Sequence, residues 1–128
     1  MEILAMRVIK SRITDYGEPI CVKLTCLDEN NSAVGRLTFD EPCSFNNEIN
    51  IQEILIEPNK RRSGIGTILL NNLKQLSVTD YTSCPIGVFI APIDNVDIDV
   101  LIEFYQSAGF EVQRSSETQD EAWGLFTP

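Results

Sequence analysis

The spacing of apolar residues changes partway along the chain, and this change limits the folds open to it. Up to residue 57 the apolar residues form short, β-branched, loosely alternating runs, which are typical of strands. From residue 64 they recur at helical spacing, and the second helical stretch stops at Gly109, a residue suited to a helix C-terminus. The pattern predicts strands at 2–12, 19–27, 33–40 and 48–57, a helix at 64–77, a strand at 86–91, a helix at 95–108, and strands at 110–115 and 121–126.

This order, β-β-β-β-α-β-α-β-β, predicts a mixed α/β domain of the α+β class with a strand–helix–strand unit at its centre. The chain has 128 residues, of which 43% are hydrophobic. That is enough for one compact core and too little for two independently stable ones, so we expect one domain over residues 1–128.

Charge and composition exclude several classes of function. The formal net charge of −9 argues against nucleic acid binding, because neutralising phosphates requires a basic face. The same charge fits a basic substrate, or a surface that is acidic for solubility alone. No apolar run approaches the ~20 residues that a membrane span needs. We therefore expect a cytoplasmic protein that binds neither membrane nor nucleic acid.

The cysteine and histidine content narrows the chemistry further. The chain has no histidine, and its four cysteines lack the paired spacing of a zinc site, so we expect no metal and reduced, mostly buried thiols. Ser-His and Cys-His nucleophilic pairs are excluded as well. Any general base must be a carboxylate, a tyrosine, an amine or a relayed water.

A strand running into a basic, glycine-containing loop and then a helix, residues 54–67, carries the chemistry. Gly64 and Gly66 let a ligand approach the backbone where the first N–H groups of the helix lack internal partners. The loop holds three of the ten basic residues, Lys60, Arg61 and Arg62. A diphosphate would suit this positive local charge and the helix dipole.

The spacing of the loop does not match the common nucleotide motifs. A mononucleotide P-loop needs lysine after its last glycine, where this chain has Thr67, and a dinucleotide fingerprint needs a third glycine where it has Leu69. The pattern Arg61-x-x-Gly64-x-Gly66, preceded by Ile54-x-Ile56-x-Pro58, resembles the acyl-CoA pyrophosphate loop of the GNAT superfamily of N-acetyltransferases.

A second segment, Tyr105-Gln-Ser-Ala-Gly109-Phe110, resembles the Tyr-x-x-x-Gly-Phe element of the same family. In that family the tyrosine lies beside the thioester sulfur and serves as general acid for the leaving thiolate, a role that the resemblance implies for Tyr105. Read without the resemblance, Tyr105 is a core aromatic in a helix that ends at glycine. The two elements lie about 40 residues apart with a strand between them, which makes their combination specific.

The resemblance, which covers roughly residues 48–126, implies a GNAT-like fold with a mostly antiparallel sheet of about seven strands and two main helices. It implies an acetyltransferase that moves an acetyl group from acetyl-CoA to a primary amine. We expect the acceptor to be a protein or peptide lysine or N-terminus, although an acidic site would also attract small molecules such as polyamines or aminoglycosides. The implied acetyl-CoA-binding residues are Leu55, Ile56, Arg61, Arg62, Ser63, Gly64, Ile65, Gly66 and Thr67.

The N-terminal half departs from the family pattern. Relatives usually place one or two helices between their first two strands, whereas residues 13–18 are too few for a helix pair. We expect an acceptor side that is unusually open or that is completed by a second chain in a homodimer.

The general base is the least determined part of the site. Strand alternation predicts Asn50, Gln52, Ile54 and Ile56 on one face and Glu53 and Glu57 on the other. The positions that match a family base, Asn50 and Gln52, do not titrate. Glu48, at the entrance on the Asn50 face, is the candidate general base, with a solvated surface acid as the alternative.

Two other interpretations stay open. The absent base and short N-terminal half fit a noncatalytic CoA-binding or protein-interaction module derived from this fold. Alternatively, Gly64 and Gly66 are turn residues and the arginines a solvated face.

Overall fold

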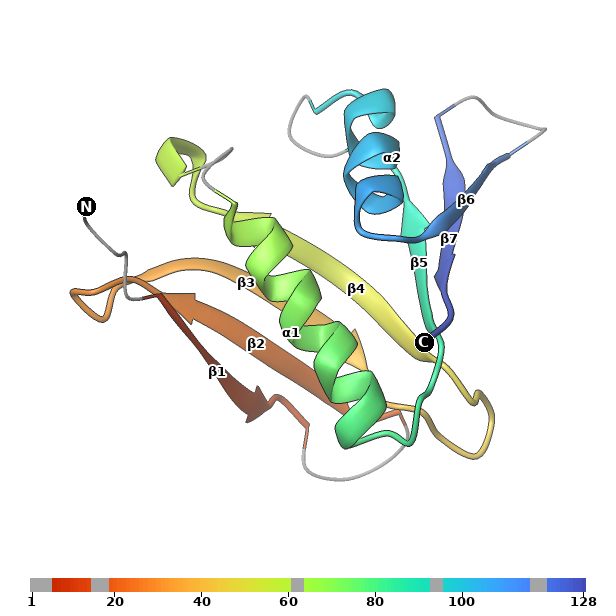
Figure 1. Ribbon diagram of the computed structural model, residues 1–128, viewed down its shortest axis with the longest axis horizontal. Coiled ribbons are helices and arrows are strands. Elements are labelled where there is room, and N and C mark those ends of the chain that lie inside the picture. Colours follow the sequence, from red (N-terminus) through yellow and green to blue (C-terminus); the bar gives the residue numbers. More distant parts are fainter. Residues whose placement is uncertain (1–5, 15–18, 61–63, 93–95, 116–119) are drawn as a thin grey trace.

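The computed structural model describes residues 6–14, 19–60, 64–92, 96–115 and 120–128, and it contains all of the expected elements (Figure 1). The elements are β1 (Arg7–Arg12), β2 (Cys21–Leu27), β3 (Ala33–Asp40), β4 (Ile49–Ile56), the 3₁₀ turn η1 (Pro58–Lys60), α1 (Ile65–Thr79), β5 (Ile86–Ile90), α2 (Ile98–Ser107), β6 (Glu111–Arg114) and β7 (Ala122–Phe126).

The strands form one sheet of seven strands in the order β1-β2-β3-β4-β5-β7-β6. Neighbours pair antiparallel except β4 and β5, which are parallel and are connected through α1. The expected fold class, a mostly antiparallel sheet with two main helices, is thus confirmed.

The main differences from expectation lie at element ends. Helix α2 begins at Ile98 rather than residue 95, because the side chain of Asp97 accepts a hydrogen bond from the Asp99 N–H and caps the helix. Helix α1 continues to Thr79, two residues beyond the predicted end. The 3₁₀ turn η1 was not predicted.

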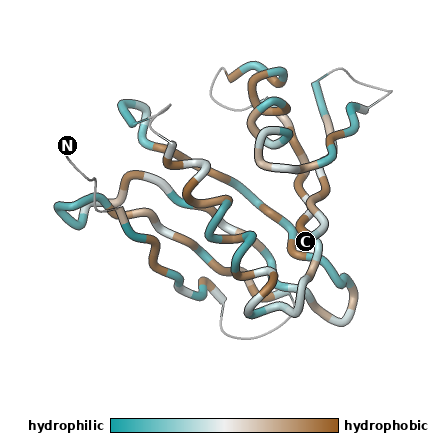
Figure 2. Tube along the Cα trace, in the orientation of Figure 1, coloured by the Kyte–Doolittle hydropathy of each residue, from teal (hydrophilic) through white to brown (hydrophobic). Residues whose placement is uncertain are grey.

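Both helices pack on the same face of the sheet (Figure 1). Helix α1 covers β2, β3 and β4, and α2 lies over β5 and β6. The apolar positions concentrate on the strands and helices (Figure 2), and one continuous buried cluster runs from Val22 on β2 to Ala122 on β7.

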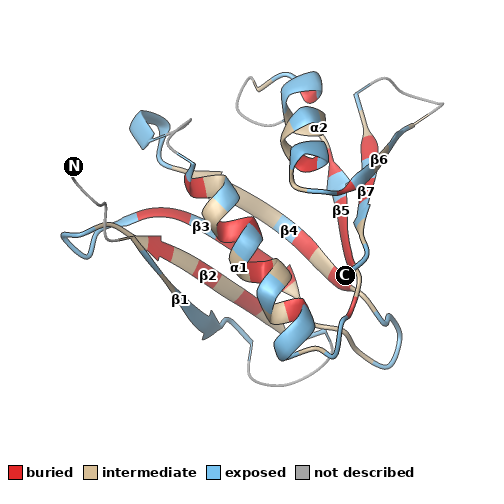
Figure 3. Ribbon diagram, viewed as in Figure 1, coloured by how far each residue is buried: buried red, intermediate tan, exposed pale blue. Residues whose placement is uncertain are grey.

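The opposite face of the sheet has no helix over it among the described residues (Figure 3). Strand β1 leads to β2 through residues 13–20, and the described part of this connection, 13–14 and 19–20, holds no helix. The cover that the family usually places here is therefore not provided by the described chain.

The four cysteines are all free, as expected for reduced thiols. Cys26 and Cys84 are buried, whereas Cys21 and Cys43 are only half-buried. Neither described helix is long and apolar enough to cross a bilayer.

Candidate functional site

The parallel pair β4 and β5 opens partway along its length. The two strands are in register only from Ile49 to Ile51 on β4 and from Ile86 to Val88 on β5. Beyond these residues β4 continues to Ile56 and β5 to Ile90 without pairing to each other. A gap therefore separates the two halves of the sheet, and the edge of β4 beyond Ile51 faces this gap.

A β-bulge in β4 lies at the start of the gap. The register of β4 against β3 shifts by one residue at Gln52, so that Ile51 and Ile54 both face the helices. Glu53 consequently shares the open face with Asn50. The simple alternation predicted from the sequence, with Ile54 on the Asn50 face, is wrong beyond Gln52.

A groove of about 810 Å³ follows the gap on the helix side. Its walls come from β4, the first turn of α1, β5 and α2. Most of the residues expected to bind acetyl-CoA line it, together with the expected general acid: Leu55, Ile56, Gly64, Ile65, Gly66, Thr67 and Tyr105. Arg61, Arg62 and Ser63 lie outside the described residues, whereas Lys60 lines the groove.

The two loop glycines are required for different reasons. Gly64 precedes α1 with a φ of 86°, a left-handed conformation that glycine adopts without strain, and a Cβ there would meet no atom within 4 Å. A Cβ on Gly66 would lie 3.0 Å from the Phe104 ring. Gly64 thus leaves open space at the helix N-terminus, and Gly66 permits the close approach of α1 and α2.

The N-terminus of α1 gives the groove a positive end. The first backbone N–H groups of a helix have no partners within the helix, and its dipole favours an anion there. No side chain caps this end, because the N-cap residue is Gly64. The first turn of α1 therefore remains accessible to a ligand group such as a phosphate.

Tyr105 lines the groove from the last turn of α2. The helix ends in a Schellman motif: the N–H of Phe110 bonds to the Tyr105 carbonyl and the N–H of Gly109 to the Gln106 carbonyl. Gly109 has the left-handed φ of 94° that this motif needs. The rings of Tyr105 and Phe110 pack edge to face at 5.4 Å, so the Tyr-x-x-x-Gly-Phe spacing fixes the position of the tyrosine.

Burial controls the ionisation of Tyr105. Its side chain is 7% exposed, and desolvation raises its pKa well above the ordinary tyrosine value. Among the described residues its hydroxyl has no hydrogen-bond partner. The hydroxyl is therefore protonated at neutral pH and can donate its proton to a group in the groove.

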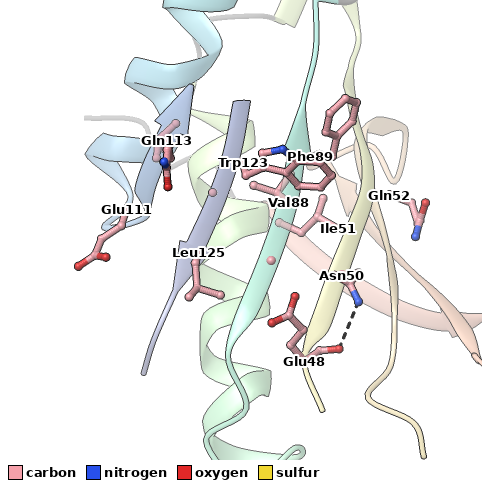
Figure 4. Close-up of a pocket in the computed structure, with 13 residues that line it drawn as sticks. Glu48, Asn50, Ile51, Gln52, Val88, Phe89, Glu111, Gln113, Trp123 and Leu125 are labelled. Atoms are coloured by element: carbon pink, nitrogen blue, oxygen red, sulfur yellow. Dashed lines mark hydrogen bonds between the residues drawn. The ribbon is translucent and has the colours of Figure 1, made fainter. Parts of the chain in front are cut away.

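A second cavity, of about 850 Å³, lies on the open face of the sheet (Figure 4). Its lining combines two carboxylates, three amides and two aromatic rings: Glu48, Glu111, Asn50, Gln52, Gln113, Phe89 and Trp123. The groove and this cavity share the residues at the strand opening, Ile51, Gln52, Val88 and Phe89. The two spaces therefore meet where β4 and β5 part.

No protein-family model and no curated protein matches the sequence, but solved structures match the fold. The spermidine N-acetyltransferase of Vibrio cholerae, in a dodecameric form, matches with a TM-score of 0.69 and 17% sequence identity. The match covers 84% of this chain and 64% of the Vibrio cholerae chain. A Bacillus anthracis protein assigned as a streptothricin acetyltransferase, solved with acetyl coenzyme A, matches with a TM-score of 0.65 and 17% sequence identity. The match covers 87% of this chain and 64% of the Bacillus anthracis chain.

A third solved structure, a Klebsiella pneumoniae protein assigned as an acyl-CoA N-acyltransferase, matches with a TM-score of 0.64 and 15% sequence identity. The match covers 84% of this chain and 72% of the Klebsiella pneumoniae chain. This chain has the GNAT acetyltransferase fold. At these identities the likeness establishes the fold alone. The chain also spans only 64% of the length of the Vibrio cholerae enzyme.

Within this GNAT fold, the aromatic residues of the open face were not predicted from the sequence. Phe89 and Trp123 pack with ring centroids 4.7 Å apart and are 45% and 59% exposed. The signal was present in β7, where Ala122 and Gly124 alternate with Trp123 and Leu125. In this alternation the small residues face the core and the large ones face outward.

Proposed function

We propose that this chain is an acetyl-CoA-dependent N-acetyltransferase whose acceptor is a primary amine. The observation that carries the proposal is the opening between β4 and β5, which joins a helix-lined groove to a separate cavity on the other face of the sheet. Such an arrangement suits direct transfer between two substrates, because the donor and acceptor can enter from different faces and meet at one point.

The residues of the groove fit the parts of the donor. The start of α1 suits a diphosphate, and the stretch of β4 that lines the groove beyond its pairing with β5, including Leu55 and Ile56, suits an amide-containing arm. Backbone N–H groups on this edge are the candidates to stabilise an oxyanion at the acetyl carbonyl. Acetyl-CoA is thus a co-substrate in this proposal, and no metal takes part.

The reaction is an acyl transfer. The neutral amine attacks the acetyl carbonyl, the C–N bond forms, and the C–S bond breaks. Tyr105 donates its proton to the departing thiolate, and the amine loses a proton to solvent or to a carboxylate. Glu48, the candidate base, lines the acceptor cavity rather than the groove.

Charge distribution supports an amine acceptor. The acceptor cavity is lined by Glu48 and Glu111 and by no lysine or arginine among the described residues. We expect a cytoplasmic location, since all four cysteines are free. Light scattering at assay concentration distinguishes a monomer with an open acceptor side from a homodimer that closes it.

The proposal is tested first by acetyl-CoA binding, measured by calorimetry at moderate salt. Gly64→Glu and Gly64→Gln impose the same backbone strain, but only the former places a negative charge at the N-terminus of α1. We expect Gly64→Glu to bind at least about tenfold more weakly than Gly64→Gln. Equal affinities of the two variants would contradict the placement of the diphosphate.

Turnover separates an enzyme from a noncatalytic CoA-binding module. We expect Tyr105→Phe to keep acetyl-CoA affinity and to lower kcat by about 100-fold, the usual contribution of a general acid. A wild type that binds acetyl-CoA and acetylates none of a broad panel of amines would favour the binding module instead.

A further inference from the structure

The Glu48 carboxylate lies over the backbone of the neighbouring strand. In the parallel register Asn50 is beside Gly87 of β5, and Glu48 immediately precedes β4. A Cβ on Gly87 would lie 2.6 Å from Oε1 of Glu48 and 3.2 Å from Oδ1 of Asn50. The absence of a side chain at residue 87 therefore creates the space that this carboxylate occupies (Figure 4).

Oxygen atoms gather at this point without a compensating cation. Glu48 and Asn50 are half-buried, and no described residue forms an ion pair with the Glu48 carboxylate. An ammonium group carries three donors and a positive charge, so the carboxylate and the Asn50 amide oxygen would both accept from it. The position is therefore a ready binding site for a protonated amine.

This position is separated from the strand opening. The carboxylate lies at the level of Gly87, whereas β4 and β5 part only after Val88. Two residues of strand, from Gly87 to Phe89, separate the two levels, which is roughly 7 Å. That separation exceeds direct hydrogen-bond reach of an amine that reacts at the opening, but it fits a second amine of the same molecule.

The surface beside this path is apolar and aromatic. Phe89 and Trp123 are cross-strand partners, as are Gly87 and Leu125 two pairs further along, and the side chains of Phe89, Trp123 and Leu125 lie on the same face (Figure 4). All three large side chains are more than 40% exposed: Phe89 45%, Trp123 59% and Leu125 41%. They offer a wall for a methylene chain and aromatic faces for a cation.

We propose that Glu48, seated over Gly87, binds a second cationic group of the acceptor, so that the preferred substrate is a linear amine with two or more positive charges. Its methylene chain lies against Phe89 and Trp123 and its reacting amine at the strand opening. This inference rests on the proposed function and gives Glu48 a substrate-binding role in place of proton acceptance.

The test compares 1,5-diaminopentane with n-pentylamine, which has the same chain and one charge fewer. Wild type should acetylate the diamine with the lower KM. Glu48→Gln should raise the KM for the diamine about tenfold, leave the KM for the monoamine unchanged, and leave the pH profile of kcat unchanged. Gly87→Ala keeps the negative charge of Glu48 but displaces its carboxylate, so this variant should show the same rise in the KM for the diamine.

Glu103→Gln is the matched control, since Glu103 is exposed on α2 and lines neither cavity. It should leave both KM values unchanged, and thermal unfolding checks that every variant is folded. The proposal is overturned if Glu48→Gln lowers kcat equally for both amines and shifts the pH profile, because Glu48 is then the proton acceptor. Equal KM values of the two amines in wild type overturn it too.

Direct binding keeps this test independent of catalysis. Calorimetry with 1,5-diaminopentane at about 0.15 M salt measures the Glu48 position whether or not acetyl transfer occurs. Binding by wild type that is lost in Glu48→Gln and Gly87→Ala supports the proposal even if no amine is acetylated. A folded wild type that does not bind the diamine overturns it even if acetyl transfer to monoamines is found.

Discussion

The two faces of the sheet differ in how their side chains are used. On the helix-covered face Leu69 of α1 is fully buried, and Gly124 is small because a Cβ there would lie 2.9 Å from Val88. On the open face the side chains of Phe89 and Trp123 are 45% and 59% exposed. Burial on one face stabilises the fold, whereas the exposed side chains of the other face line the cavity that we propose for the acceptor.

The largest expected difference between the faces is in stability. Leu69→Ala on the helix side should lower the free energy of unfolding by about 2–5 kcal/mol, because it removes buried apolar surface and leaves a cavity. Chemical denaturation monitored by fluorescence measures this. A loss below about 1 kcal/mol would mean that the helix layer is loosely packed and would remove the contrast between the faces.

The pH dependence of stability should also report on the helix side. The pKa of Tyr105 is raised in the folded chain, so its stabilisation is complete below the unfolded pKa of about 10 and is lost as the pH rises above that value. Stability should fall by about 1.4 kcal/mol per pH unit from this residue above pH 10. When the free energy of unfolding is measured from pH 8 to 11, it should fall less steeply with pH for Tyr105→Phe than for wild type. The same dependence on pH in both proteins would contradict the burial of the Tyr105 hydroxyl.

The smallest effect on stability is expected on the open face. Trp123→Thr removes an exposed ring and its packing on Phe89 but substitutes a residue that strands favour, so the free energy of unfolding should change by about 1 kcal/mol or less. The same variant should weaken diamine binding, which calorimetry measures. A loss of stability comparable to that of Leu69→Ala would show that the open face is part of the core.

Much of the helix-side groove could be predicted from local sequence. The glycines of the loop, the change of period at residue 64 and the Tyr105-to-Phe110 spacing are short-range signals, because helix ends obey local backbone rules. The bulge at Gln52 could not be predicted this way. It depends on the pairing of β4 with β3, which no local pattern around Gln52 encodes.

The sequence by itself determined the order of elements, the fold class and the position of the groove at the start of α1. Each follows from hydrophobic period and backbone preference, which act within a few residues. Only the tertiary structure decided that Gly66 makes room for Phe104 and Gly87 for the Glu48 carboxylate. Contacts between residues far apart in the chain are set by how the sheet and helices pack, so these two glycines acquire their roles only in the folded protein.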